Sequence, residues 1–355
     1  MTANPYNCAS NDSCRSGQQL PPIGHSFVCC YLARDLEELS KTMNNETRSR
    51  ENAGSQFVPL SLLLVISVPG LVGNAAVVGS YLRFSALRIK VCLHLLTALA
   101  LTDSLAGFGL SLVSIGQAVL RVSTISMTNL GCLVLPFPST VGVISSQLMI
   151  LSVAWDRFQA FKNPIEYRKK RHKRYALHCL CVSLVIGLAF SFTIFVGVDL
   201  LAVSVSCVSK DVAPNLFLFL YFVFILFVCP SVVILYGAVV YKMNQHTKRQ
   251  QNAQLRDRAL ERQVRATQSI NWVLFLYSLF FCAPNYLIFS AVLFKFPPDI
   301  LGYLTGLGAI GSAINTGCNP FVYAAKNDDI RKYVKNFFKL KPESRTESTN
   351  NRTVY

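Results

Sequence analysis

Long uninterrupted apolar stretches dominate the hydrophobic pattern of this chain. A bilayer core about 30 Å thick is crossed by roughly 20 apolar residues in a helix that rises about 1.5 Å per residue. Seven stretches of this kind occur in the sequence. They lie near Phe57–Leu82, Val91–Gly116, Thr128–Trp155, Tyr175–Val198, Asn215–Lys242, Gln268–Leu293 and Leu301–Ala325. The pattern therefore predicts seven membrane-spanning segments.

These segments are apolar on most faces and show no alternation of polar and apolar residues. Spanning β-strands would alternate in segments of about ten residues. A helix satisfies its own backbone hydrogen bonds inside lipid, where water cannot do so. The predicted fold class is an all-α membrane protein, a seven-transmembrane helix bundle with a short C-terminal amphipathic interfacial helix.

Four segments make up the expected domain organisation. Residues 1–56 are polar and form an extracellular tail that we expect to be largely disordered, and residues 57–325 form the seven-transmembrane domain. Residues 326–340 carry apolar side chains at three-and-four spacing, which predicts an interfacial amphipathic helix. These side chains are Ile330, Tyr333, Val334, Phe337 and Phe338. Residues 341–355 are polar and form an expected disordered cytoplasmic tail.

Composition agrees with this picture, because 52% of the residues are apolar and only 15% are charged. A water-soluble globule of this size rarely shows such a balance. The net charge of +16 could indicate nucleic-acid binding. However, the basic residues flank the predicted spans and do not line one soluble face together with aromatic residues, so we expect no nucleic-acid partner.

The basic residues also predict the orientation. Lys and Arg are retained on the cytoplasmic side of a membrane. If the N-terminus is outside, 26 of the 34 Lys and Arg residues fall on cytoplasmic segments. The expected protein is multi-pass, with an extracellular N-terminus and a cytoplasmic C-terminus. Its basic cytoplasmic rim would suit anionic lipid and a cytosolic partner with acidic patches.

The outer side carries sequence features of an exported, oxidising environment. Asn11 and Asn45 begin glycosylation sequons in the N-terminal tail. Six of the 12 cysteines also fall outside the membrane in this orientation. They are Cys8, Cys14, Cys29, Cys30, Cys132 and Cys207. No cysteine pair has metal-ligand spacing with histidine, so a cysteine metal site is not expected.

Asp103 is the only acidic residue well inside a predicted span. A carboxylate in lipid costs several kcal/mol unless it is solvated, so it needs an explanation. One interpretation is a cluster of polar side chains whose hydrogen bonds hold helices together. The other is a small-cation site, in which Asp103 supplies charge and Ser146, Asn315 and Asn319 supply neutral oxygens. Both interpretations remain open on the residues alone, and no other cofactor is expected.

Several motifs occur in a fixed order along the spans. They are Gly73-Asn74, Leu99-Ala100-Leu101-Thr102-Asp103, Cys132 at 25 residues before Arg157, Asp156-Arg157-Phe158, Pro164 with Tyr167, Pro230, Pro284, and Asn319-Pro320-Phe321-Val322-Tyr323. In these motifs the chain resembles the rhodopsin-like (class A) G-protein-coupled receptor family, and the resemblance covers every predicted span.

The resemblance implies a mechanism without catalysis, so the chain is not expected to be an enzyme. An extracellular ligand shifts a two-state bundle in the plasma membrane, and a cytoplasmic cleft opens for a heterotrimeric G protein, with arrestin as a further partner. The implied coupling residues are Asp156, Arg157, Phe158, Pro164, Tyr167, Asn319, Pro320 and Tyr323. The resemblance also implies a Cys132–Cys207 disulfide and a sodium ion at Asp103, Ser146, Asn315 and Asn319.

Family positions also imply a ligand pocket. Its residues are Ser139, Thr140, Val143, Phe222, Leu226, Asn285, Tyr286, Phe289, Ala309 and Ala313. Aminergic receptors place an aspartate where Ser139 stands, and opsins place the retinal lysine where Ala313 stands, so neither class fits. The apolar and neutral polar lining suits a neutral small molecule or a peptide. Ordinary helix packing is the alternative at each position.

The chain departs from the family pattern at the positions that normally respond to ligand. Phe281-Cys282-Ala283-Pro284 lacks the usual sixth-helix tryptophan. Polar Gln147 and Ser278 stand where apolar and aromatic residues normally pack against Pro230. These changes indicate a divergent branch, similar to invertebrate and particularly nematode serpentine chemoreceptors or to neuropeptide-type receptors.

Two other functions remain open. A seven-helix small-solute transporter should show inverted repeats, broken helices or additional intramembrane charges for coupling ions. Asp103 alone gives that hypothesis little support. A decoy or scaffold receptor that does not signal is also compatible with the sequence, because the residues that normally trigger activation are altered.

Overall fold

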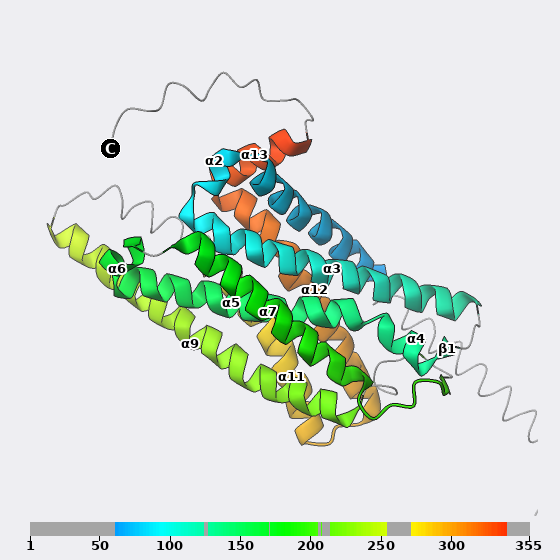
Figure 1. Cartoon of the computed structure of the whole chain (residues 1–355). Helices are drawn as coiled ribbons and strands as arrows, with labels where there is room; N and C mark the ends of the chain where they lie inside the picture. Colours follow the sequence, from blue (N-terminus) through cyan, green and yellow to red (C-terminus); the bar gives the residue numbers. More distant parts are fainter. Residues whose placement is uncertain are drawn as a thin grey trace, which may run out of the picture. The chain divides into compact units, whose positions relative to one another are not determined.

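A computed structural model describes residues 61–123, 127–169, 171–204, 207, 214–253 and 271–338. The expected N-terminal tail, with its sequons at Asn11 and Asn45, and the tail at 341–355 lie outside these residues. Most of the described chain is helical, and long helices run side by side (Figure 1).

Six described helices are long and apolar enough to cross a membrane. They are the first helix (Ser61–Arg83), α3 (Val91–Ser123), α5 (Phe137–Lys162) with α4 (Asn129–Val134) before it, α7 (His172–Phe192), α9 (Asn215–Ala253) and the sixth spanning helix (Asn271–Leu293), which ends in α11 (Ala283–Leu293). The seventh is α12 (Pro298–Lys326). Its glycine and polar residues lower its mean hydropathy. Its 29 residues nevertheless extend about 43 Å at 1.5 Å per residue, which is longer than a bilayer core of about 30 Å. The predicted seven-helix bundle is confirmed.

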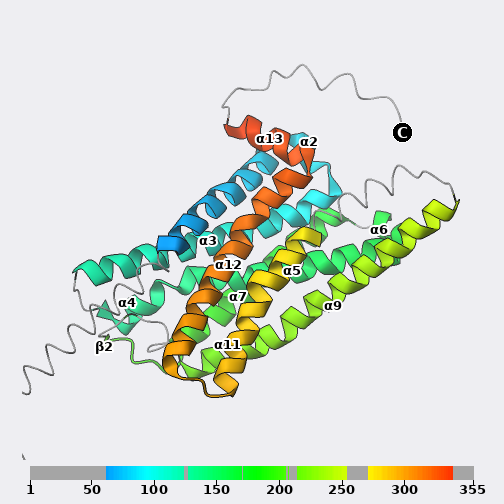
Figure 2. The ribbon, with the colours of Figure 1, turned by 180° about the vertical axis from the view of Figure 1, so that it is seen from behind.

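Short elements mark the two ends of the bundle. The helices α2 (Ser85–Arg88), α6 (Pro164–Lys169) and α13 (Asp328–Phe338) lie at one end in both views (Figures 1 and 2). The opposite end carries α4 and the antiparallel strands β1 (Met127–Thr128) and β2 (Val203–Ser204), with Met127 opposite Ser204. A 3₁₀ turn, η1 (Thr193–Phe195), follows α7.

The third spanning segment, predicted near Thr128–Trp155, is present but contains a break. The structure divides this segment into α4 and α5, with Leu135 and Pro136 between them. Proline has no backbone N–H, so Pro138 cannot donate the hydrogen bond that would continue α4. The hydroxyls of Ser139 and Thr140 instead donate to the Pro136 carbonyl at 2.7 and 3.0 Å. Because of this break, α5 begins at Phe137, and this start determines which way the later side chains of α5 point.

Glycines bring α3 and α5 into close contact at the centre of the bundle. A Cβ atom at Gly142 of α5 would overlap the backbone of Ala106 in α3, and one at Gly109 of α3 would overlap the backbone of Ser139. Helices in membranes commonly associate through small residues of this kind. The close approach places the polar side chains of α3 directly against those of α5.

The apolar face of α13 packs on the bundle. Ile330 is buried, and Tyr333 and Val334 pack against the main hydrophobic core. The Phe337 ring lies over Gly79 of the first helix, where a Cβ atom would come within 2.9 Å of the ring. Phe338 is exposed, so most of the predicted apolar face contacts protein and its last residue faces outward.

Candidate functional site

Asp103 lies at the centre of a buried polar cluster that joins three helices. Its carboxylate on α3 has no exposed surface. The Ser146 hydroxyl of α5 donates to Asp103 Oδ1 at 2.5 Å, and the Asn319 amide of α12 donates to Oδ2 at 2.7 Å. Two donors partly offset the cost of burying a carboxylate. The structure therefore brings together three of the four residues expected around the cation.

Asn315, the fourth residue, makes no hydrogen bond to Asp103. It is fully buried one helical turn before Asn319, and neither of its amide atoms has a hydrogen-bond partner among the described residues. The Asn319 Oδ1 atom has none there either. Buried polar atoms without partners are rare in proteins. Carboxylate, hydroxyl and amide oxygens are the donors that a hard cation prefers, so these residues fit a sodium ion.

Asn74 of the first helix supports the proline bend in α12. Pro320 has no N–H, so the Thr316 carbonyl one turn earlier lacks its usual helical donor. The Asn74 amide donates to this carbonyl at 2.9 Å. A Cβ atom at Gly73 would lie 2.8 Å from the Pro320 ring, so only glycine allows the ring to pack so closely there. The Gly73-Asn74 pair thus holds the helix segment that carries Asn319.

Asp156 and Arg157 form a buried ion pair at the end of α5. Arg157 Nη2 lies 3.1 Å from Asp156 Oδ2, and the two side chains are 5% and 1% exposed. The Tyr167 hydroxyl of α6 donates to the same carboxylate oxygen at 2.9 Å. The His172 ring packs against Tyr167 with centroids 4.5 Å apart. Arg157 is therefore restrained by Asp156, and Asp156 in turn is restrained by Tyr167 of α6.

The other expected coupling residues lie at or near the same end of the bundle. Phe158 is partly buried, and the Lys162 ammonium lies 5.9 Å from its ring centroid. Pro164 is the first residue of α6, a position where its fixed φ favours a helix start. Tyr323 is 1% exposed, and its hydroxyl has no hydrogen-bond partner among the described residues. A buried phenol without a partner is available to bond to another group if the bundle rearranges.

Part of the expected ligand pocket comes together between α9 and α11. The rings of Phe222 and Phe289 have centroids 5.7 Å apart. The Tyr221 hydroxyl donates to Asn285 Oδ1 at 3.0 Å, and the Asn285 amide donates to the Phe281 carbonyl at 2.8 Å. Tyr221 was not expected from the sequence, because a tyrosine inside a continuous apolar run gives no periodic signal.

The remaining pocket residues do not gather in this cluster. Ala309 and Ala313 pack in a separate group with Leu63 and Leu110. Leu226 is 39% exposed. Ser139 and Thr140 use their hydroxyls at the start of α5, while Val143 and Tyr286 pack on the main core. Of the expected pocket residues, the structure therefore brings together those on α9 and α11.

The sixth spanning helix departs from regular geometry at the altered motif. Residues 271–277 are α-helical, Ser278–Cys282 form a π-helical turn, and α11 continues from Ala283. Pro284 has no backbone N–H, so it cannot donate a helical hydrogen bond just after this turn. A Cβ atom at Gly311 of α12 would overlap the Phe280 carbonyl oxygen. The absence of a side chain at Gly311 thus lets α12 pack directly on the irregular turn.

Aromatic and sulfur groups pack around the altered motif of the sixth spanning helix. The Tyr277 and Phe281 rings stack with centroids 5.4 Å apart and an interplanar angle of 15°. Cys229 Sγ lies 3.4 Å from the Tyr277 hydroxyl. Gln147 is fully buried, and neither of its amide atoms has a partner among the described residues. Ser278, the other polar replacement, differs from Gln147 in being satisfied. Its hydroxyl donates to the Leu274 carbonyl.

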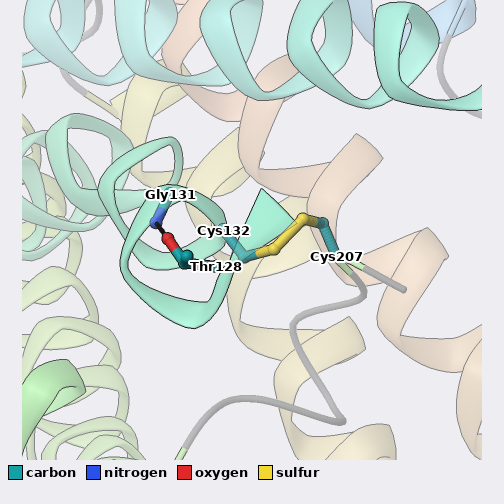
Figure 3. Close-up of a disulfide and its surroundings, with 4 residues drawn as sticks. All are labelled: Thr128, Gly131, Cys132 and Cys207. Atoms are coloured by element: carbon teal, nitrogen blue, oxygen red, sulfur yellow. Dashed lines mark hydrogen bonds between the residues drawn. A yellow bond between two sulfur atoms is a disulfide. The ribbon is translucent and has the colours of Figure 1, made fainter. Parts of the chain in front are cut away.

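At the opposite end, a disulfide joins Cys132 of α4 to Cys207 (Figure 3). The two Cα atoms are 5.1 Å apart and the residues are separated by 75 positions. The Thr128 hydroxyl accepts a hydrogen bond from the Gly131 N–H, which caps α4 beside the bridge. The pairing is the one implied by the family resemblance, and it ties the segment after β2 to the start of the third span.

Residues 73–323 match the family model described as 7 transmembrane receptor (rhodopsin family). This match covers well over half of the chain. The chain therefore belongs to the rhodopsin family of seven-transmembrane receptors, and it is a multi-pass membrane protein. It is similar to the mouse adenosine receptor A2b, with 25% identity over 298 residues that cover 77% of this chain and 87% of that protein.

Proposed function

We propose that this receptor binds an extracellular ligand and activates a heterotrimeric G protein at the end of the bundle that carries α6. The observation that carries the proposal is the buried Asp156–Arg157 pair, with Tyr167 of α6 on the same carboxylate. A guanidinium is expensive to bury without a partner, so the pair favours a closed state. Its release would present a cation to an acceptor on the G protein.

Tyr323 supports a second state of the same bundle. Its hydroxyl is buried and has no hydrogen-bond partner among the described residues, and it lies one turn beyond Asn319. In the proposed active state the sixth spanning helix moves outward and Tyr323 turns toward Arg157. A ligand drives this change only if it binds the active arrangement more tightly than the closed one.

We further propose that sodium stabilises the closed state at Asp103. Ser146 and Asn319 already contact this carboxylate, and the Asn315 and Asn319 side-chain oxygens are buried acceptors without partners in the described chain. A bound cation would satisfy these acceptors and supply positive charge beside Asp103. The ion would link α3, α5 and α12 and so oppose their rearrangement.

The proposed ligand is a neutral small molecule or a peptide with an apolar end. Phe222 and Phe289 offer aromatic surface, and the Tyr221–Asn285 pair offers neutral hydrogen-bonding groups. No candidate pocket residue is charged. Because a similar mouse protein is an adenosine receptor, adenosine is the first small molecule to test.

We place the N-terminus outside the plasma membrane and the C-terminus in the cytoplasm, with arrestin and membrane lipid as further partners. In this arrangement residues 1–56 form an extracellular tail glycosylated at Asn11 and Asn45, and residues 341–355 form a cytoplasmic tail. The basic loops support the orientation, since α2, α6 and α13 share one end of the bundle (Figure 2).

The test is nucleotide exchange on a panel of G proteins in membranes that contain the chain. Adenosine, other neutral small molecules and peptides are added in turn, with membranes lacking the chain as the control. Ligand-dependent exchange on at least one G protein is the expected result. A chain that binds a ligand but never promotes exchange on any member of the panel would be a decoy receptor, and the coupling proposal would be withdrawn.

A further inference from the structure

Two free cysteines meet between α9 and the sixth spanning helix, which run side by side (Figures 1 and 2). Cys229 lies on α9, and Cys282 is the last residue of the π-helical turn. Their side chains are 0% and 4% exposed. The Cys282 thiol lies within side-chain hydrogen-bond range of the Cys229 thiol. We refer to these two residues as the thiol pair.

The π-helical turn brings Cys282 to this position. Backbone hydrogen bonds in such a turn join residues five apart, as the Ala283 N–H does with the Ser278 carbonyl. Tyr277 and Cys282 are also five residues apart, and a regular α-helix would point them about 140° away from each other. Here both face Cys229, because the Tyr277 hydroxyl lies 3.4 Å from Cys229 Sγ and within hydrogen-bond range of the Cys282 thiol. The irregular turn therefore assembles the thiol pair beside a hydroxyl.

Burial determines which oxidant can react with the thiol pair. The thiolate is the reactive form of cysteine, and burial in apolar surroundings disfavours it. A hydrogen bond from the Tyr277 hydroxyl to Cys229 Sγ offsets part of this cost. Hydrogen peroxide is uncharged and close to water in size, so it can enter between packed helices. A bulky, charged oxidant cannot contact sulfur atoms that have almost no exposed surface.

We propose that the thiol pair is an oxidation site at which hydrogen peroxide joins Cys229 to Cys282 by a disulfide. The Cys229 sulfur attacks the peroxide, whose O–O bond breaks, to give a sulfenic acid and one water. The Cys282 thiol then attacks the Cys229 sulfur, which forms the S–S bond and releases the second water. Two thiols and one peroxide thus give one disulfide and two waters, and the two electrons lost by sulfur reduce the peroxide.

The disulfide would tie α9 covalently to the sixth spanning helix. The bond would lie beside the stacked rings of Tyr277 and Phe281, at the irregular turn of that helix. It would oppose the outward movement of the sixth spanning helix, so the oxidised receptor would stay closed. This effect on signalling rests on the proposed function, whereas the formation of the disulfide does not.

The test treats the purified chain in phosphatidylcholine nanodiscs with hydrogen peroxide, alkylates the remaining thiols and digests the chain without a reductant. Mass spectrometry should detect a cross-linked peptide that contains Cys229 and Cys282. Cys229→Ser and Cys282→Ser should each lose this peptide. Cys181→Ser, which removes an exposed free thiol from α7, should keep it. Oxidised glutathione, a bulky charged disulfide, should not produce it.

Absence of the cross-linked peptide after peroxide treatment of the folded parent chain would overturn the site. Equal cross-linking by oxidised glutathione would overturn the assignment to a small neutral oxidant. Thermal unfolding in the same nanodiscs reports whether each variant is folded. It should also show that peroxide raises the unfolding temperature of the parent by about 5 °C and leaves that of Cys282→Ser unchanged.

Nucleotide exchange tests the effect on signalling separately. Ligand-independent exchange by the parent chain should fall in proportion to its cross-linked fraction, and exchange by Cys282→Ser should be the same with and without peroxide. A fully cross-linked parent chain with unchanged exchange would show that the disulfide does not hold the receptor closed. A chain that forms the disulfide but never promotes exchange, reduced or oxidised, would support the oxidation site and contradict the coupling proposal instead.

Discussion

Single prolines shape two of the spanning helices. Pro320 leaves the Thr316 carbonyl without its helical donor, and Pro284 removes a backbone N–H just after the π-helical turn. Asn74 donates to the Thr316 carbonyl, and Gly311 lets α12 approach the turn. The sequence shows the prolines and the asparagine. It does not show that they meet, because the two helices are more than two hundred residues apart.

Removing the Asn74 amide should destabilise the protein. Asn74→Leu leaves the Thr316 carbonyl buried without a donor, which costs about 1–3 kcal/mol. Ser80→Ala is the matched control, since the Ser80 hydroxyl is buried in the same helix without a partner among the described residues. Unfolding in detergent as a function of temperature measures both variants. Equal unfolding temperatures for Asn74→Leu and Ser80→Ala would contradict the role of the Asn74 hydrogen bond.

Asp103→Asn should abolish the effect of sodium on agonist affinity. The substitution keeps the shape of the side chain but removes the charge that would attract the cation. Agonist titrations in sodium and in a bulky organic cation at equal ionic strength measure the effect. Ser111→Ala, a buried hydroxyl of the same helix that bonds to Ser67, should keep the sodium response of the parent. The same sodium response in Asp103→Asn would remove the cation site.

At the scale of elements, glycines set the distances between helices. Gly142 and Gly109 allow close contact of α3 and α5, and Gly73 accommodates the Pro320 ring. The sequence predicts where the helices are, since that depends on apolar length. It does not predict which faces meet, because helices in lipid associate through small residues that also occur on lipid-facing surfaces, such as Gly237, which has no atom within 4 Å of its added Cβ.

Two Gly→Ala substitutions should therefore have opposite effects. Gly237→Ala adds a methyl group in open space and replaces a poor helix former, so stability should be unchanged or higher by up to about 1 kcal/mol. Gly142→Ala places a methyl group against the Ala106 backbone, and overpacking typically costs about 1–3 kcal/mol. The yield of folded protein and its unfolding temperature provide the comparison. Equal behaviour of the two variants would show that α3 and α5 are not closely packed at Gly142.

One contact joins the ends of the sixth and seventh spanning helices. The Lys326 ammonium at the end of α12 lies 5.5 Å from the Trp272 ring centroid. An exposed cation–π contact contributes about 0.5–1 kcal/mol, so Trp272→Leu should raise ligand-independent nucleotide exchange by about two- to fivefold. Lys326→Arg keeps the contact and should leave exchange unchanged. Exchange in Trp272→Leu at or below the parent level would show that this contact does not favour the closed state.

At the scale of the whole molecule, the sequence predicted the number and order of the spanning helices. Apolar length is a local property, and each span can be found without its neighbours. The break at Pro136 was missed because both halves are apolar, and the Tyr277–Phe281 stack was missed because it depends on a π-helical turn. The pocket stays a prediction, since positions carried over from a family contain no information on how altered residues repack.

In the proposed mechanism Arg157, restrained by Asp156, controls coupling to a G protein. The most direct measurement is nucleotide exchange by a purified G protein in the presence of the purified parent chain or one of two variants. Asp156→Asn removes the charge that restrains Arg157 and keeps a hydrogen-bond acceptor for Tyr167, so ligand-independent exchange should increase. Arg157→Ala removes the group that would contact the G protein in the proposed mechanism, so exchange should fall to the level without receptor. Exchange that is the same for the parent and both variants would contradict the account.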